Sequence, residues 1–272
     1  MKILHGSPFR WFILQATALS RLLALFALFA TASGLLAADR YDLMIEGAVD
    51  FEIAPLLDAL QGRQQIQLGS WTYWTGRIGS KSVVIARTEQ GPINAAASTA
   101  FGIDRFHPAA IIDQGTAGAH NPDYDVFDIV LGAKVTDFSA SKSDLARSPP
   151  APHELRLGGH QLKSFTGFEG DAALLATARN TPYDKGKVQI GNIGSAYAFD
   201  RQIDFIRWVR QTYGTDSEDM ESAYAAGVAA GMQIPFLAIR IISNSQLNHP
   251  KFEREAGTYC AQFVLRLVRS MK

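Results

Sequence analysis

Residues 109–118 read AAIIDQGTAG, an apolar run that leads into a glycine-rich segment. Short apolar runs bounded by glycine are typical of strands that are buried on both faces of a sheet. We therefore predict a strand over residues 109–112 and a tight turn over residues 115–118. An apolar run followed by turn-forming residues also occurs at residues 41–48 and 236–244, which predicts a sheet with several buried strands.

Helical and strand patterns alternate on either side of this segment. Pro92 is predicted to be the first residue of a helix, where proline is tolerated because the backbone N–H at this position makes no hydrogen bond within the helix. The predicted strands cover residues 41–46, 71–75, 82–88, 109–112, 128–131, 187–193 and 236–242, and the main predicted helices cover residues 53–60, 92–100, 199–212, 219–231 and 252–271. This alternation predicts an α/β fold, a three-layer sandwich with a central twisted mixed β-sheet flanked by helices. The polar, proline-containing stretch 139–159 is predicted to be an irregular loop.

The composition is that of an ordinary globular protein. The 272 residues are 47% hydrophobic and carry 26 basic and 26 acidic side chains, so no excess charge points to a nucleic-acid partner. No Gly/Ser-rich or charged linker separates the periodic segments, which predicts one domain over residues 39–272. Cys260 is the single cysteine, so no intramolecular disulfide can form, and its spacing with Phe263, Val264 and Leu267 predicts a buried packing residue.

Residues 1–38 have the features of a secretory signal peptide. Lys2 and Arg10 precede an apolar run over residues 22–30, and small residues follow before Asp39. We expect this segment to be removed, which would leave an exported protein without membrane attachment, and the periplasm is the natural compartment. An uncleaved N-terminal anchor is the alternative, although spanning a bilayer takes about 20 apolar residues.

Four predicted strand ends carry residues suited to chemistry. They are Glu52 after the first strand, residues 115–118 after the middle strand, Met220-Glu221, and Ser243-Asn244 after the last strand. Ligands of open α/β sheets bind at the carboxyl ends of strands, so we expect these segments to line one cleft. No group of His, Cys or carboxylate residues has the spacing of metal ligands, and we expect neither a metal nor another cofactor.

Together these segments resemble the methylthioadenosine/S-adenosylhomocysteine nucleosidases of the nucleoside phosphorylase superfamily. Residues 47–53 (GAVDFEI) are similar to the family's opening Gly-Ala-x-x-x-Glu, and residues 115–118 (GTAG) to its Gly-Ser-Ala-Gly. Residues 219–222 (DMES) contain its Met-Glu pair, and residues 240–244 (RIISN) resemble its Arg-x-x-Ser-Asp. The resemblance implies a nucleoside phosphorylase-like fold, a homodimer, and hydrolysis of the N-glycosidic bond of 5′-methylthioadenosine/S-adenosylhomocysteine-like adenine nucleosides.

The resemblance also assigns roles to individual residues. Breaking a ribose–purine bond creates an oxocarbenium-like sugar, so the site needs a carboxylate that helps water attack and support for the departing base. Glu52 would activate the water, and Glu221 would accept hydrogen bonds from both ribose hydroxyls. Met220 belongs to the same ribose-binding segment. Four residues would frame the base, with Tyr197 as a second candidate for stacking: Thr116, Ala117, Gly118 and Phe199.

Asn244 departs from the family pattern, in which an aspartic acid at this position protonates the leaving purine. An amide cannot deliver a proton, and loss of a general acid typically costs about 10² to 10⁴ in rate. An asparagine can recognise adenine, or it can donate to a 6-oxo group while it accepts from a protonated ring nitrogen, which favours hypoxanthine or guanine. His120 and His249 are alternative proton donors near the predicted cleft, although an exposed loop histidine is the more common explanation for each.

Two other functions stay open. Phosphorylases of this fold need cations that hold phosphate, whereas here the first turn carries acids and Asp113 precedes the glycine-rich segment, with Arg87 as the basic candidate nearby. The second possible function is that of a non-catalytic nucleoside-binding or storage protein, because a protein that has lost catalysis is expected to lack the general acid. Glu52 and Glu221 argue against it, since two carboxylates in one cleft indicate a functional site.

Overall fold

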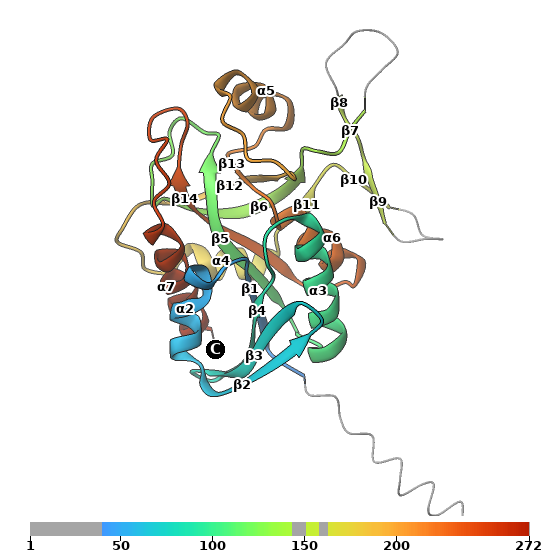
Figure 1. Cartoon of the computed structure of the whole chain (residues 1–272), viewed down its shortest axis with the longest axis vertical. Helices are drawn as coiled ribbons and strands as arrows, with labels where there is room; N and C mark the ends of the chain where they lie inside the picture. Colours follow the sequence, from blue (N-terminus) through green and yellow to red (C-terminus); the bar gives the residue numbers. More distant parts are fainter. Residues whose placement is uncertain (1–39, 143–150, 158–162, 272) are drawn as a thin grey trace, which may run out of the picture. The chain divides into compact units, whose positions relative to one another are not determined.

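The computed structural model describes residues 40–142, 151–157 and 163–271 (Figure 1). The predicted leader over residues 1–38 lies outside these ranges, and so does part of the predicted loop at residues 139–159. Within the described residues, no helix is both long and apolar enough to cross a membrane.

A mixed β-sheet lies at the centre of the fold. Its strands are β1 (Leu43–Gly47), β2 (Gln61–Leu68), β3 (Trp71–Ile78), β4 (Lys81–Arg87), β5 (Ile111–Ala119), β6 (Ile129–Asp137), β11 (Phe168–Glu169), β12 (Val188–Ser195), β13 (Ser217–Asp219) and β14 (Phe236–Asn244). They are ordered β11-β6-β12-β13-β5-β1-β4-β3-β2, and β14 pairs with both β5 and β6. Because β1 runs parallel to β4 and β5 while β3 runs antiparallel to β4, the predicted mixed α/β sheet is confirmed.

Strand β14 closes part of this sheet into a ring. It pairs in parallel with β5 and antiparallel with β6, and the pairs β6–β12, β12–β13 and β13–β5 complete the circuit. Closure pairs both edges of these strands, so their backbone hydrogen bonds are satisfied without a free edge. The ring also places the ends of β5, β13 and β14 next to each other, where the predicted site residues lie.

Helices cover both faces of the sheet, as predicted (Figure 1). One face packs against α2 (Asp50–Ala59), α4 (Ala172–Arg179) and α7 (Glu255–Ser270), and the other against α3 (Pro92–Phe106) and α6 (Ser222–Gly231). Alternate strand residues point to opposite faces. On β1, Leu43 and Ile45 therefore join the core beneath α2 and α7, while Met44 joins the core beneath α3 and α6.

The last helix contains the single cysteine. Cys260 is fully buried in the core beneath α7, which confirms its prediction as a packing residue. Burial raises the pKa of its thiol to about 12, so the thiol stays protonated at neutral pH and is a poor nucleophile.

Three local predictions were wrong. Residues 115–118 are not a turn but the second half of β5, because β14 and β13 supply partners on both sides of that segment. Strand β2 was missed because its side chains are polar and mostly exposed, so they carry no alternating pattern. The segment predicted as an irregular loop contains three short strands, β7 (Ser141–Lys142), β8 (Ala151–Pro152) and β9 (Leu155–Leu157), of which β7 and β8 pair, and β9 pairs with β10 (Lys163–Phe165).

Candidate active site

The predicted site residues lie around one cavity of about 120 Å³. They come from the start of α2, from β5 and β14, and from the segments that precede α5 (Ile203–Tyr213) and α6. The cavity is lined by all eight predicted residues: Glu52, Thr116, Ala117, Gly118, Phe199, Met220, Glu221 and Asn244. A more open pocket of about 710 Å³ lies beside His120 and α5 but contains none of these eight. We assign the smaller cavity as the candidate site because the carboxylates converge there.

Glu52 is held in one orientation by backbone and hydroxyl donors. Its Oε1 accepts hydrogen bonds of 2.9 Å from the backbone N–H and from the hydroxyl of Thr116. Its Oε2 accepts from the backbone N–H of Ala48 at 3.0 Å, within the turn that opens α2. These contacts fix a carboxylate that is only 4% exposed at the edge of the cavity, and such preorganisation is what a group that activates water requires.

Gly115 allows Glu52 to lie this close to β5. A Cβ atom at Gly115 would lie 3.0 Å from Glu52 Oε1 and would overlap the guanidinium of Arg240. Glycine is therefore needed here for close approach and not for a turn, although the sequence pattern suggested a turn.

Glu221 faces the cavity from the first residue before α6. Its Oε1 accepts a 2.8 Å hydrogen bond from the backbone N–H of Gly91, and its Oε2 lies 3.2 Å from the backbone N of Met220. Burial, reinforced by the negative charge of Asp219, raises the pKa of Glu221 to about 8. The carboxyl is thus partly protonated near neutral pH in the free protein, and ribose hydroxyls would donate to its ionised form.

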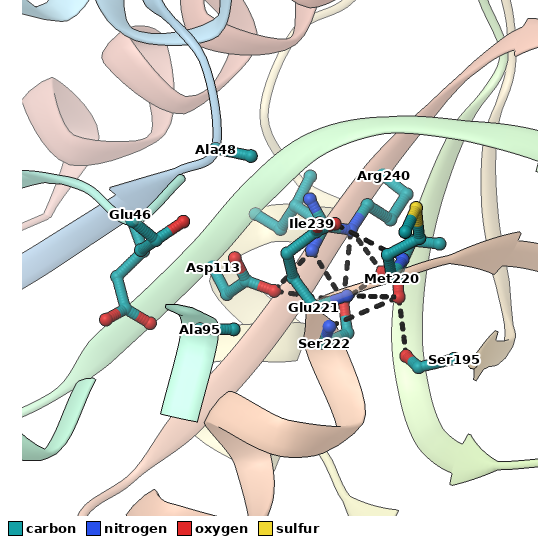
Figure 2. Close-up of polar contacts among 12 residues, drawn as sticks. Glu46, Ala48, Ala95, Asp113, Ser195, Met220, Glu221, Ser222, Ile239 and Arg240 are labelled. Carbon is teal, nitrogen blue, oxygen red and sulfur yellow. Dashed lines mark hydrogen bonds and ion pairs between the residues drawn. The ribbon is translucent and has the colours of Figure 1, made fainter. Parts of the chain in front are cut away.

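Beneath Glu221, Arg240 is buried in an ion-pair network that Figure 2 shows. Its Nη2 contacts Asp113 Oδ2 and its Nε contacts Asp219 Oδ2, each at 2.5 Å. Both Arg240 nitrogens also donate to Ser222 Oγ, at 3.0 and 2.8 Å. Two carboxylates around one guanidinium supply the charge compensation that buried ions need, and the network fixes the start of α6, which carries Glu221.

Asp113 consequently has a different role from the one predicted. It does not line the cavity but pairs with Arg240, and burial raises its pKa to about 6 even though Arg240 opposes the rise. Arg87, the predicted basic candidate for phosphate, forms ion pairs of 2.9 Å with Asp50 and 2.8 Å with Glu89 and does not line the cavity either.

Asn244 lies at the end of β14 and is 3% exposed. Its Oδ1 accepts a 3.0 Å hydrogen bond from the hydroxyl of Ser243. The Nδ2 amino group is the end that approaches Gly118 on β5. The amide therefore presents its donor toward this part of the cavity.

The two aromatic candidates for stacking are placed differently. Phe199 lines the cavity and is 55% exposed, in the segment before α5 and not inside a helix as predicted. Tyr197 does not line the cavity; its ring lies against Gly91, where an added Cβ atom would be 3.0 Å from the ring. The geometry therefore favours Phe199.

The two histidine candidates also differ in their burial and in their position relative to the cavity. His249 lies at the surface, 3.1 Å from Glu253 and outside the cavity. His120 is 1% exposed and lies 3.1 Å from Glu218, which lines the cavity, so the interpretation as an exposed loop histidine is wrong for His120. Sequence reasoning missed Glu218, although its place in a run of acids directly before the Met-Glu pair was a usable signal.

Two carboxylates that converge at the strand ends of an α/β fold form an arrangement that hydrolysis of a glycosidic bond can use. The chain belongs to the phosphorylase superfamily, whose family model matches residues 42–269. No group of three or more His, Cys, Asp or Glu side chains arranged for a metal ion occurs among the described residues.

Comparisons with individual proteins narrow this assignment. The chain is 25% identical over 235 residues to the 5′-methylthioadenosine/S-adenosylhomocysteine nucleosidase of Bacillus licheniformis, covering 82% of this chain and 96% of the relative. The MTA/SAH nucleosidase of Streptococcus pneumoniae in complex with 8-aminoadenine has a TM-score of 0.72 at 26% identity, covering 85% of this chain and 100% of that one. A futalosine hydrolase mutant of Helicobacter pylori has a TM-score of 0.71 at 20% identity, covering 84% and 99%, and shows the shared fold. The resemblance seen in the sequence is confirmed, and the predicted enzyme class, an N-glycosidase, agrees with these relatives.

Proposed function

We propose that this protein is a nucleosidase that hydrolyses the N-glycosidic bond of adenine nucleosides of the 5′-methylthioadenosine/S-adenosylhomocysteine type. The observation that carries the proposal is the convergence of Glu52 and Glu221 on one cavity from separate elements. Glu52 would take a proton from the attacking water while Glu221 holds the ribose hydroxyls, and Thr116 to Gly118 with Phe199 would contact the base. The names of the relatives support the choice of adenine nucleosides.

Release of free base from defined nucleosides tests this proposal. The purified protein is incubated with methylthioadenosine, S-adenosylhomocysteine, adenosine, inosine and guanosine, with and without phosphate, and the released base is quantified. We expect adenine release that does not depend on phosphate. No release from any nucleoside would contradict the proposal and favour a nucleoside-binding or storage protein.

Hydrolysis is favoured over phosphorolysis by the charges of the cavity. Among the described residues, none of the side chains lining it is a lysine or an arginine. The nearby cations are engaged, because Arg87 pairs with Asp50 and Glu89 while Arg240 pairs with Asp113 and Asp219. A phosphate dianion beside Glu52 and Glu221 would lack compensating charge.

A second candidate, hydrolysis of 6-oxopurine nucleosides, is favoured by the orientation of Asn244. Asn244 Oδ1 lies beside Ser243 Oγ and its Nδ2 lies toward Gly118, so the amide presents a donor there. A 6-oxo group is an acceptor that matches this donor, whereas the amino group of adenine does not. Release of hypoxanthine or guanine alone in the same assay would move the assignment to this candidate.

We further propose that the protein is exported to the periplasm and works as a homodimer. The order of basic, apolar and small residues in residues 1–38 supports export. Exposed apolar side chains between residues 197 and 205 support a second copy as their partner: Tyr197, Phe199, Ile203 and Phe205. Cell fractionation and N-terminal sequencing test the first proposal, and the mass of the purified protein by light scattering tests the second.

A further inference from the structure

Glu218 is a buried carboxylate of the cavity that none of the roles above uses. It lies on β13 and is 6% exposed. In the register of the sheet, Gly118 pairs with Glu218 on one side and with Asn244 on the other. A Cβ atom at Gly118 would lie 3.3 Å from Glu218 Oε1 and 3.7 Å from Asn244 Nδ2. The carboxylate and the amide thus flank the same point of the cavity wall.

His120 lies behind Glu218 and contacts it through one ring nitrogen. Its Nδ1 is 2.7 Å from Thr215 Oγ1, and its Nε2 is 3.1 Å from Glu218 Oε2. The Thr215 hydroxyl can donate to Nδ1 or accept from it, and Nε2 faces the carboxyl group of Glu218 in both tautomers. Neither Nε2 nor Oε2 has an aligned hydrogen bond among the described residues. Buried polar atoms without a partner are rare, and here two of them face each other beside the cavity.

Asp200 adds a second carboxyl group to this cluster. Its backbone N–H donates to Glu218 Oε1 at 3.3 Å. Burial, followed by the negative charge of Glu218, raises the pKa of Asp200 to about 6. The cluster therefore contains, directly beside Glu218, a carboxyl group that keeps its proton to a higher pH than an exposed aspartic acid does. The titratable groups that face or adjoin Glu218 are His120, Asp200 and Asp219.

The imidazole of His120 also borders the larger pocket of about 710 Å³. Arg207 and Arg210 of α5 also line that pocket, as does Leu247 after β14. His120 therefore lies between the candidate active site and a second, more open space. This position gives the cluster a route for proton exchange that does not pass through the substrate cavity.

We propose that Glu218 is the proton donor to the leaving base, in place of the acid that Asn244 lacks. This inference rests on the proposed nucleosidase function. As the C1′–N9 bond breaks, its electron pair passes to the base, and the carboxyl proton of Glu218 moves to a ring nitrogen. Water bonds to C1′ and gives its proton to Glu52. Glu52 then releases to solvent the proton that it took from water. Solvent returns a proton to Glu218 by way of His120, a positioning residue, so nucleoside and water yield free base and ribose without net proton change.

The test compares three proteins: the unchanged protein, Glu218→Gln, and the double variant Glu218→Gln with Asn244→Asp. For each, kcat, KM and the pH profile are measured on the nucleoside from which base is released fastest. For Glu218→Gln we expect kcat to fall about 10²- to 10⁴-fold, with KM changed less than about threefold. The decline of kcat at alkaline pH, where a proton donor is lost, should vanish in this variant. Adding Asn244→Asp supplies an acid on the other side of Gly118 and should restore kcat at least about tenfold.

Several outcomes would overturn the inference while the nucleosidase function stands. A raised KM with unchanged kcat would mean that Glu218 only binds the base, and a loss that Asn244→Asp does not rescue would mean a structural role. Glu218→Asp keeps a carboxylic acid at this position and replaces the glutamine variant in the test if that variant does not fold. Its kcat should still decline at alkaline pH. Asp204→Asn, which removes a fully exposed acid of α5, is the control and should match the unchanged protein. If the unchanged protein releases no base from any nucleoside, the proposed function fails and this inference fails with it.

Discussion

The two walls of the cavity differ in how completely their polar groups are paired. On the Glu52 wall, formed by Glu52, Thr116 and Glu221, the carboxylate oxygens accept from backbone or hydroxyl donors. On the Asn244 wall, formed by Gly118, Glu218 and Asn244, one oxygen of Glu218 lacks an aligned hydrogen bond, as does Nε2 of His120 behind it.

This difference follows the family pattern. The Glu52 wall keeps the residue types of the nucleosidases, whereas the Asn244 wall replaces their acid by an amide. A fully paired group is held in place for one task, while an unpaired buried group is costly unless a ligand or a proton completes it. Under the proposed function, the Glu52 wall would perform a fixed step and the Asn244 wall would decide the specificity.

Removing the carboxylate of Glu52 should have the largest effect. In Glu52→Gln the amide cannot accept the proton of water, so we expect kcat to fall about 10²- to 10⁴-fold with little change in KM. Asp58→Asn, on the exposed side of the same helix, is the control and should keep full activity. Steady-state base release measures both, and an active Glu52→Gln protein would remove the distinction between the walls.

Glu221→Gln should weaken substrate binding and remove a pH dependence of the stability. Hydrogen bonds to a charged acceptor contribute about 1.5 to 3 kcal/mol, so kcat/KM should fall about 10- to 100-fold. The pKa of Glu221 is raised in the folded protein from 4.5 to about 8, so the unchanged protein loses stability as pH rises between these values.

The neutral amide lacks this loss, and thermal unfolding can detect the difference. We expect the melting temperature of Glu221→Gln, relative to the unchanged protein, to increase from pH 5 to pH 9. A difference that stays constant over this range would mean that the carboxyl group ionises as readily as in the unfolded chain.

Asn244→Asp should shift the choice of base by a smaller factor. The substitution removes the amide N–H that Asn244 offers to a 6-oxo group, and a matched contact to a base edge contributes about 1 to 3 kcal/mol of discrimination. We expect the ratio of kcat/KM for adenosine over inosine to rise about tenfold or more. The ratio is measured by competition between the two nucleosides, and an unchanged ratio would show that residue 244 does not contact the base.

Phe199→Ala should have the smallest effect. The ring is half exposed at the edge of the cavity, and an aromatic stacking pair contributes about 0.5 to 1.5 kcal/mol. We expect KM to rise about two- to tenfold with little change in kcat. Tyr197→Ala is the matched comparison, since Tyr197 lies outside the cavity, and an equal effect of both changes would show that stacking does not single out Phe199.

Much of the fold could be predicted because periodicity is local. The buried runs in β1, β5 and β14 are nearly continuous and apolar, and Pro92 marks the start of α3. What could not be predicted depends on partners distant in the chain. Residues 115–118 look like a turn in isolation, yet they extend β5 because β14 and β13 pair with them. Strand β2, whose side chains are mostly exposed, is defined by backbone pairing with β3 and not by its side chains.

For the site, the sequence by itself determined which residue types are present: Glu52, the Met220-Glu221 pair, and an amide at residue 244 where the family has an acid. Each adjoins a strand or helix end, so the chain order was enough to predict that they converge. Only the tertiary structure decided that Asp113 neutralises Arg240 in the interior and that Glu218 and His120 meet beside Asn244. Such pairings depend on strand register and burial, which join residues about 100 positions apart and leave no local pattern in the sequence.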